Sequence, residues 1–238
     1  SLLSFVDAVA TKVSDSQYQP TWESLDSRPN PSWYDDIKFS VSLHWGVYSV
    51  PAFSDPNGSN DLGEWFWNYA GENGTSDSPQ GKFMRSVYGD NFRYADFASM
   101  WKAELYDPNH WADLFAKNHV QMAVLTSKHH EGFDLFPSEN AFNWNAGDVG
   151  PNRDLVKDFL DGMRGRGLKA GVYHSVFEWF NPLLNNGNGS RYVEDKFIPD
   201  MHLLTTEYQP DMFLMDGEWN VSRLHTRHLF TLKSTTAT

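Results

Sequence analysis

An abrupt change from apolar to polar residues marks the segment Asp211–Trp219. Four consecutive apolar residues, Met212 to Met215, are followed directly by Asp216. Such a run predicts a strand that is buried on both faces, and parallel sheets carry catalytic groups at the carboxyl ends of their strands. Asp216 is therefore a candidate catalytic carboxylate, with the capping of a helix or the bracing of a turn as the alternative role.

Three other expected strands also end in polar or aromatic clusters, which are His44-Trp45, His129-His130 and Tyr173-His174. In a barrel of parallel strands all carboxyl ends lie on one face, so these clusters and Asp216 would meet in one site. The alternative for each histidine is a structural role in the core with its hydrogen bonds satisfied, and His174 is the one to which we apply it in particular.

Two kinds of chemistry suit these residues. His44, His129, His130 and Asp216 are ligand types for a zinc site, but adjacent residues of a strand point to opposite faces unless the chain has already turned. The other kind is carbohydrate chemistry, since retaining hydrolysis of a glycoside needs one carboxylate to attack the anomeric carbon and a second carboxyl group roughly 5 Å away to protonate the leaving oxygen. Asp216 suits the first of these roles, and histidines and tryptophans suit the binding of a sugar ring.

Strands and helices alternate along the chain in the order that a parallel sheet requires. Strands are expected at 38–44, 120–126 and 168–174 and up to Asp216. Helices are expected from Asp107-Pro108 to about Asn118, from about Pro151 to Gly165 and Gly167, and from about Arg191 to Tyr208 with a bend at Pro199. Residues 48 to about 101 are expected to form a long irregular excursion, which in a compact domain is usually a functional loop.

The pattern contains four strands, half of the eight in a (β/α)₈ barrel. The expected fold class is α/β, a TIM-like barrel of which about the first half is present. Residues 1–20 are expected to be an N-terminal arm or leader remnant, 21–219 a partial catalytic barrel domain and 220–238 a divergent tail. Because an open sheet of four strands exposes apolar surface, we expect a fragment, a truncated product or a half that needs a partner, and a homo-oligomer is one way to supply that partner.

Composition excludes several classes of partner and site. The chain has 238 residues, 40% of them hydrophobic and 16% aromatic, which is enough for one sizeable core. With 19 basic and 31 acidic residues the net charge is -12, so no nucleic-acid partner is expected. No apolar run approaches the roughly 20 residues that cross a bilayer. The absence of cysteine excludes disulfides, thiolate metal sites and a cysteine nucleophile.

Four Asn-X-Ser/Thr sequons indicate the secretory pathway. They begin at Asn57, Asn73, Asn188 and Asn220, each in a stretch expected to be an exposed loop. Residues 2–10 resemble the end of a signal peptide with a small-residue cleavage site, although Asp7 is atypical there. These features fit a lysosomal or secreted protein.

Several separate segments resemble one known family, the α-L-fucosidases of glycoside hydrolase family 29, and especially the animal tissue enzymes. The matching segments are Tyr18–Pro29, Lys38–Ala52, Glu64–Trp67, Trp111–Phe115, Leu125–Phe133, Asp148–Val156, Gly171–Ser175 and Glu178–Phe180. The resemblance runs from about residue 18 to 219, and it is specific because its motifs are spread over several loops.

The resemblance implies a (β/α)₈-like catalytic domain in which Asp216 matches the nucleophile. The residues that match contacts to fucose in the family are His44, Glu64, Trp65, His129, His130 and Tyr173. In the implied mechanism Asp216 forms a covalent fucosyl-enzyme, which water resolves with retention. The implied substrates are fucosylated glycans, and no metal or organic cofactor is required.

The chain departs from the family pattern beyond the nucleophile strand. The family's acid/base is in most members a glutamate well beyond that strand, where this chain offers only Glu218, and the C-terminal β-domain of the family has no counterpart. Glu64 is therefore the possible proton donor to test. Two hypotheses follow: an α-L-fucosidase, or a truncated, catalytically inactive relative with a fucose-binding or structural role.

Overall fold

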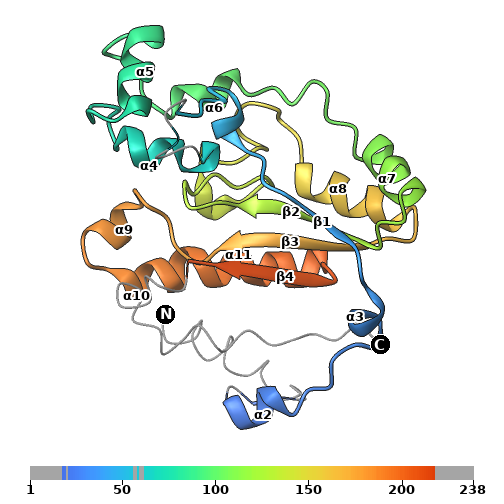
Figure 1. Cartoon of the computed structure of the whole chain (residues 1–238). Helices are drawn as coiled ribbons and strands as arrows, with labels where there is room; N and C mark the ends of the chain where they lie inside the picture. The colour runs from blue at the N-terminus through green and yellow to red at the C-terminus, as the bar shows by residue number, and fades with distance from the viewer. Residues whose placement is uncertain (1–17, 20, 56–57, 59–61, 218–238) are drawn as a thin grey trace.

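Four parallel strands form the centre of the computed structural model, which describes residues 18–19, 21–55, 58 and 62–217. The strands are β1 (Ser40–Leu43), β2 (Met122–Lys128), β3 (Lys169–Ser175) and β4 (Met212–Asp216). They lie side by side in chain order, and each pairs in parallel with the next (Figure 1). This order is the one that successive strand-helix units of a barrel produce, so the predicted α/β class is confirmed.

The connections between the strands are helical. Between β1 and β2 lies α7 (Pro108–Lys117), which begins as predicted because the Asp107 side chain accepts a hydrogen bond from the His110 N–H at 3.1 Å. Between β2 and β3 lies α8 (Leu155–Arg164). It begins four residues later than the expected start near Pro151, because Asp154 is its capping residue and accepts from the Lys157 N–H at 2.9 Å.

A longer helical segment joins β3 to β4. It starts with α9 (Pro182–Asn185) and continues as α10 (Gly189–Tyr192), the π-helical turn η4 (Val193–Phe197), α11 (Ile198–Leu203) and a second π-helical turn, η5 (Leu204–Tyr208). Pro199 stands in the first turn of α11, where its missing N–H removes no bond from that helix. The expected helix at about 191–208 is therefore confirmed, with π-helical turns on both sides of α11.

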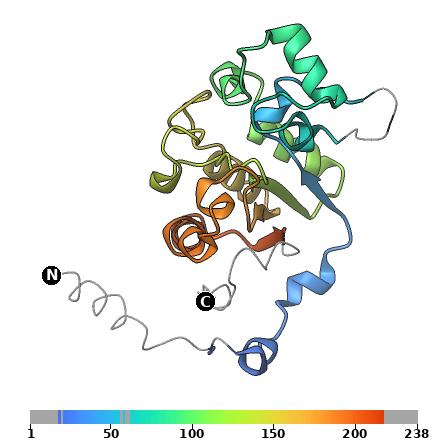
Figure 2. The same cartoon turned by 90° about the vertical axis from the view of Figure 1, so that its left-hand side faces the viewer.

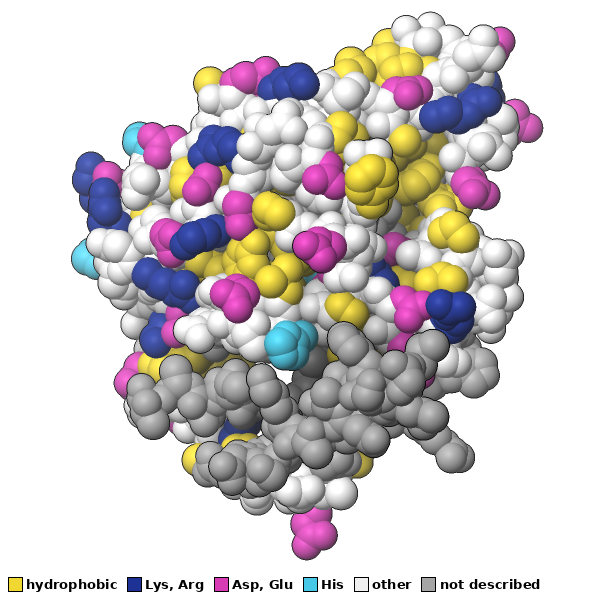
Figure 3. Space-filling view, turned by 180° about the vertical axis from the view of Figure 1, so that it is seen from behind, with side chains coloured by type: hydrophobic (Ala, Val, Ile, Leu, Met, Phe, Trp, Pro, Cys, Tyr) yellow, Lys and Arg dark blue, Asp and Glu magenta, His cyan; other side chains and the backbone are white. Residues whose placement is uncertain are grey.

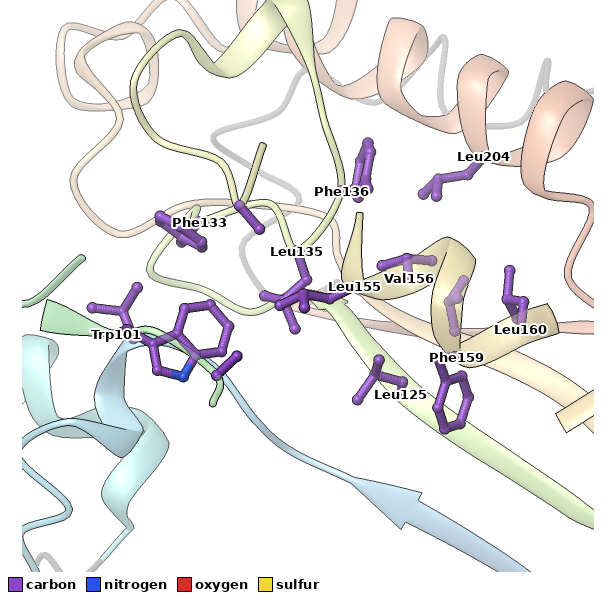
Figure 4. Close-up of a cluster of buried hydrophobic side chains, with 14 of the residues drawn as sticks. Trp101, Leu125, Phe133, Leu135, Phe136, Leu155, Val156, Phe159, Leu160 and Leu204 are labelled. Carbon is purple, nitrogen blue, oxygen red and sulfur yellow. The ribbon is translucent and has the colours of Figure 1, made fainter. Parts of the chain in front are cut away.

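The main core lies between one face of the sheet and these helices. Leu125 of β2 faces α8, and the segment after β2 adds further apolar side chains to the same cluster (Figure 4). The cluster in that view also includes Phe133, Leu135, Phe136, Leu155, Val156, Phe159, Leu160 and Leu204. Each of these side chains is at most 1% exposed, and the full burial of one such side chain contributes about 1.5 to 3 kcal/mol.

The opposite face of the sheet carries the alternate residues of the same strands. Met122, Val124 and Tyr173 form a second buried cluster there, against which Trp33 and Ile37 pack. Trp33 belongs to α3 (Ser32–Asp36), which follows α2 (Trp22–Asp26). Both short helices lie to one side of the sheet-helix body (Figure 2). In a barrel this face is the interior, which is where a site would be expected.

The excursion after β1 is more regular than predicted. It contains η1 (Val47–Ser49), η2 (Gly63–Trp65), α4 (Phe66–Ala70), α5 (Pro79–Tyr88) and α6 (Asp96–Met100). The expectation of a largely irregular loop was therefore wrong. Ser78 caps α5 by accepting from the Gly81 N–H at 3.0 Å, and Pro79 occupies the first helical position, so a helix-start signal was present in the sequence.

Strand β4 is not buried on both faces, which corrects the expectation from its apolar run. Leu214 and Met215 are 43% and 36% exposed, because β4 is an edge strand of the sheet that the described residues form. Apolar side chains also show between charged ones on the face opposite to that of Figure 1 (Figure 3). No helix within the described residues is long and apolar enough to span a membrane.

Candidate active site

Asp216, the last residue of β4, is held from two directions. The Tyr173 hydroxyl donates to its Oδ2 at 2.6 Å, and the Gly217 N–H donates to Oδ1 at 2.7 Å. Gly217 has φ +93°, and a Cβ at this position would lie 2.4 Å from a ring carbon of Phe177, so only glycine fits the turn that follows β4. The Asp216 side chain is 34% exposed, so an oriented carboxylate remains accessible to a ligand.

His130 faces this carboxylate. Its Nε2 lies 3.6 Å from Asp216 Oδ2, and its Nδ1 lies 2.7 Å from Ser175 Oγ. The Ser175 hydroxyl donates to the Phe177 carbonyl at 2.5 Å, so it accepts from an Nδ1–H of His130, and Nε2 is the nitrogen that faces Asp216. Burial lowers the pKa of His130 to about 4 although the Asp216 charge opposes this shift, so the ring is neutral near pH 7.

His44 is oriented in the same way on the other side of Tyr173. The Thr126 hydroxyl donates to the Leu43 carbonyl at 2.9 Å, and His44 Nδ1 lies 3.1 Å from Thr126 Oγ1. Nδ1 therefore carries the proton, and Nε2 can accept a hydrogen bond from a ligand hydroxyl. The rings of His44 and Tyr173 are 4.6 Å apart, edge to face. Desolvation lowers the pKa of His44, while the charges of Glu64 and Asp216 act in the opposite direction.

His129 and His130 lie in the same site because the chain turns directly after β2. An irregularity in the pairing with β3 lies between Thr126 and Lys128, and the chain then leaves the strand. The two imidazole rings are 4.3 Å apart, and the His129 ring stacks on Tyr173 at 5.6 Å. Burial lowers the pKa of His129 well below its usual value. The turn thus removes the objection that adjacent residues point to opposite faces.

Glu64 and Trp65 reach the site from η2, in the excursion after β1. The Trp65 ring lies 5.8 Å from His130 and 5.0 Å from Trp179. Burial lowers the pKa of His44 and raises that of Tyr173, and the charge of Glu64 opposes the first shift and adds to the second, so Glu64 lies within electrostatic range of both residues. Ring contacts and hydrogen bonds therefore join six of the seven residues that were expected in the site, and the seventh, Glu64, directly precedes one of them, Trp65, in η2.

Two residues of the strand-end clusters do not belong to the site. Trp45 packs away from it, with its ring 4.8 Å from Trp101 and 4.9 Å from Tyr106. His174 is fully buried and faces Phe197 of η4, with its Nδ1 2.9 Å from Ser127 Oγ. Both are sequence neighbours of site residues whose side chains point to the other face. The alternative of a core histidine is thus correct for His174.

Some expected residues lie outside the described part of the chain. They are Glu218 and Trp219, the sequon residues Asn57 and Asn220, the leader remnant and the tail. The other two sequon residues, Asn73 and Asn188, are exposed. Among the residues that the structure describes, no group of three or more His, Asp or Glu side chains is arranged to hold a metal ion.

Comparison with known proteins identifies the family. The alpha-L-fucosidase family profile matches residues 5–237. The chain belongs to the α-L-fucosidase family. It is 44% identical to tissue alpha-L-fucosidase of Rattus norvegicus over 224 residues, which are 92% of this chain and 46% of that protein. It is 45% identical to the tissue enzyme of Homo sapiens over 210 residues, which are 85% of this chain and 42% of that protein.

Solved structures agree with the sequence relatives. An alpha-L-fucosynthase of Thermotoga maritima, in complex with a fucosyl-fucose azide, superposes with a TM-score of 0.76 at 30% identity, over 89% of this chain and 54% of that one. The chain thus spans about half the length of the relatives it matches. The four strands are accordingly the first half of a TIM-like barrel of this α-L-fucosidase family, as expected.

Sequence reasoning missed the residues that orient the site. Thr126 and Ser175 each fix the tautomer of a histidine, and Phe177 stacks on His130 at 4.8 Å. Thr126 and Ser175 lie inside the quoted motifs, at the ends of β2 and β3, so their position near the strand ends was a usable signal. Phe177 follows the Gly171–Ser175 motif by two residues and had no chemical signal of its own.

Proposed function

We propose that this chain is the nucleophile-bearing half of a retaining α-L-fucosidase that removes terminal α-L-fucose from glycoconjugates. The observation that carries the proposal is the carboxylate of Asp216 at the carboxyl end of β4. It is fixed by the Tyr173 hydroxyl at 2.6 Å and surrounded by the histidines of two other strand ends. A carboxylate held in this way is what nucleophilic attack on an anomeric carbon needs.

The reaction proceeds in two displacements at the anomeric carbon. An Asp216 oxygen forms a bond to that carbon while the bond to the leaving oxygen breaks, and a general acid protonates the leaving oxygen. Water then attacks the same carbon, gives its proton to the conjugate base of that acid and releases Asp216. The neutral imidazoles of His44 and His130 provide ring nitrogens that hydrogen-bond to the sugar hydroxyls. Trp65 and Trp179 provide aromatic faces on which the apolar side of the sugar ring can pack.

Glu64 is the proposed general acid. It directly precedes Trp65, whose ring lies 5.8 Å from His130, its charge acts on His44 and Tyr173, and it belongs to a different element than Asp216 does. Two other glutamates near the site are unsuited to this role. Glu131 is buried behind it and accepts a hydrogen bond from the Tyr94 hydroxyl, and Glu178 is paired with Lys128 at 2.9 Å.

A second candidate function is an inactive relative that binds fucose without turnover. The observation that favours it is that Glu131 accepts from Tyr94 and Glu178 is paired with Lys128, which leaves Glu64 as the one candidate acid among the described glutamates near the site; without proton donation by Glu64 the site would bind fucose without turnover. With either function, the protein would follow the secretory pathway to the lysosome or out of the cell. Asn73 and Asn188, which are both exposed, would then carry glycans.

The two functions are separated by kinetics of the 238-residue chain on a chromogenic aryl α-L-fucoside. We expect turnover that Asp216→Ala lowers by at least roughly 10³-fold and that azide partly restores, because azide enters the space of the missing carboxylate and forms a fucosyl azide of inverted configuration. Asp211→Asn, at the other end of the β4 segment, is the matched control and retains activity. Fucose binding without turnover would favour the inactive relative, and full activity of Asp216→Ala would overturn the nucleophile assignment.

A further inference from the structure

A buried ion pair joins the carboxyl ends of β2 and β3. Lys128, the last residue of β2, has a fully buried side chain, and its Nζ donates to Glu178 Oε1 at 2.9 Å and to the Tyr192 hydroxyl at 3.0 Å. Glu178 lies in the loop after β3, and its Oε2 accepts from Asn181 Nδ2 at 2.8 Å. Taking both charges out of water is costly unless each has good partners, and here each has them.

The two partners of this pair directly precede residues of the candidate site. His129 and His130 follow Lys128, and Trp179 follows Glu178. The Trp179 N–H donates to the His130 carbonyl at 2.8 Å, and the two rings are 5.3 Å apart. The ion pair and this backbone hydrogen bond therefore fasten the turn that carries both histidines to the loop after β3.

Gly132 shows how closely this turn lies against Glu178. It has φ +83°, and a Cβ at this position would lie 2.7 Å from Glu178 Oε2. The turn His129–Gly132 thus has Lys128 at one end and the Glu178 carboxylate packed against the other. A shift of Glu178 would move both ends of the turn, and with them the His130 ring beside Asp216.

We propose that Lys128 and Glu178 are positioning residues for the candidate active site, which fix the His129–His130 turn so that His130 Nε2 faces Asp216. The proposal rests on the fucosidase function proposed above. Neither side chain is placed to touch a sugar bound at Asp216, because Glu178 and Tyr192 enclose the Lys128 ammonium, and the Glu178 carboxylate, 6% exposed, is engaged by Lys128 and Asn181. They act through the backbone of the two loops that they join.

The test replaces both charges at once. Lys128→Met alone would leave an unpaired buried carboxylate and is expected to unfold at a much lower temperature. The double variant Lys128→Met/Glu178→Gln leaves no charge in this pair. The Tyr192 hydroxyl also donates to Glu178 Oε1 at 3.3 Å, and the amide oxygen introduced by Glu178→Gln can still accept this bond. The matched control is Lys169→Met/Asp211→Asn, which removes an ion pair of 2.7 Å between the β3 and β4 segments at the amino end of the sheet.

We expect the double variant to unfold cooperatively within a few degrees of the wild type, with kcat about 30-fold lower and KM changed less than about threefold, since a misplacement of about 1 Å costs up to roughly 10²-fold in rate. The control should keep kcat within about twofold. A double variant with wild-type kcat and a folded structure would overturn the proposal while leaving the fucosidase function intact.

Contacts between rings test the positioning role of Lys128 and Glu178 independently of enzymatic activity. In NMR spectra of the wild type, the His130 ring should show proton contacts to Phe177 and Trp179, and the double variant should lose them. If the wild type neither binds a fucose-configured iminocyclitol nor turns over an aryl fucoside, the fucosidase function fails, and these contacts still test the positioning role. Unchanged ring contacts in the double variant would exclude the positioning role.

Discussion

At the scale of single residues, Tyr173 is the side chain most directly coupled to the candidate nucleophile. Burial and the neighbouring Asp216 raise the pKa of Tyr173 far above its usual range, so its hydroxyl keeps the proton and acts only as a donor to Oδ2. We expect Tyr173→Phe to fold normally and to lower kcat/KM about 10- to 100-fold, because a hydrogen bond to a carboxylate contributes about 1.5 to 3 kcal/mol.

Tyr208→Phe is the matched control for this prediction. It removes a tyrosine-aspartate hydrogen bond of the same length, 2.6 Å to Asp154 Oδ2, at a distance from the strand ends that carry the site. Steady-state kinetics and thermal unfolding are measured on both variants. Equal kinetic losses in the two would mean that the Tyr173 hydroxyl has no special relation to Asp216.

At the scale of elements, Asp154 joins two parts of the helix layer. It caps α8 through the Lys157 N–H and also accepts the Tyr208 hydroxyl at the end of η5. We expect Asp154→Ala to lower the free energy of unfolding by about 1 to 2 kcal/mol, as the loss of a helix cap does. Asp154→Asn should retain most of the stability, because asparagine is an equally good cap. Urea unfolding of both variants checks this, and equal losses would contradict the capping role.

The sequence predicted the order of elements better than their limits. Asp107-Pro108 is an unambiguous helix start and was placed correctly. Near α8 the chain offers Pro151 before Asp154, and only the hydrogen bond to Lys157 shows which residue is the cap. In the excursion, η2, α4 and α6 were missed because they have only three to five residues and stand among turn-forming stretches. The ten residues of α5 match the length of α7 and α8, and this helix was missed although Ser78-Pro79 marks its start.

Residue types at strand ends predicted most of the candidate site, and the family resemblance added Glu64 and Trp65 from the excursion after β1. The orientation of the side chains was not predicted. Alternation along a strand does not show that the chain turns after Lys128, so it argued against bringing His129 and His130 together. The irregular pairing with β3 after Thr126 that precedes this turn depends on contacts to a neighbouring strand, which one segment of sequence cannot show. The hydroxyls of Thr126 and Ser175 act through partners that only the folded sheet brings close.

At the scale of the whole molecule, buried groups in the site and behind it respond to pH in opposite directions. Burial lowers the pKa values of His129 and His174, so each of them costs stability as the pH falls below about 6.5, where the unfolded chain binds a proton and the folded one does not. Burial raises the pKa of Asp134 to about 7, and that carboxyl costs stability as the pH rises. The loss from Asp134 develops between about pH 3.8 and 7, so below about pH 6.5 it changes with pH in the opposite direction to the cost from the two histidines, and the effects partly cancel there.

Glu131 offers the clearest measurement of this balance. Burial raises its pKa to about 8, although the Tyr94 hydroxyl and the Val47 N–H favour the charged form. Its folded-state pKa lies above the usual 4.5, so its contribution to stability is complete below pH 4.5 and is lost as the pH rises to about 8. Glu131→Gln cannot ionise and can still accept from Tyr94. We expect the free energy of unfolding of the variant to match that of the wild type near pH 4.5. Above this pH the variant should become more stable than the wild type, by up to roughly 1.4 kcal/mol per pH unit until about pH 8. Urea unfolding at several pH values measures this difference, and a difference that does not change with pH would show that Glu131 is ionised in the folded chain throughout.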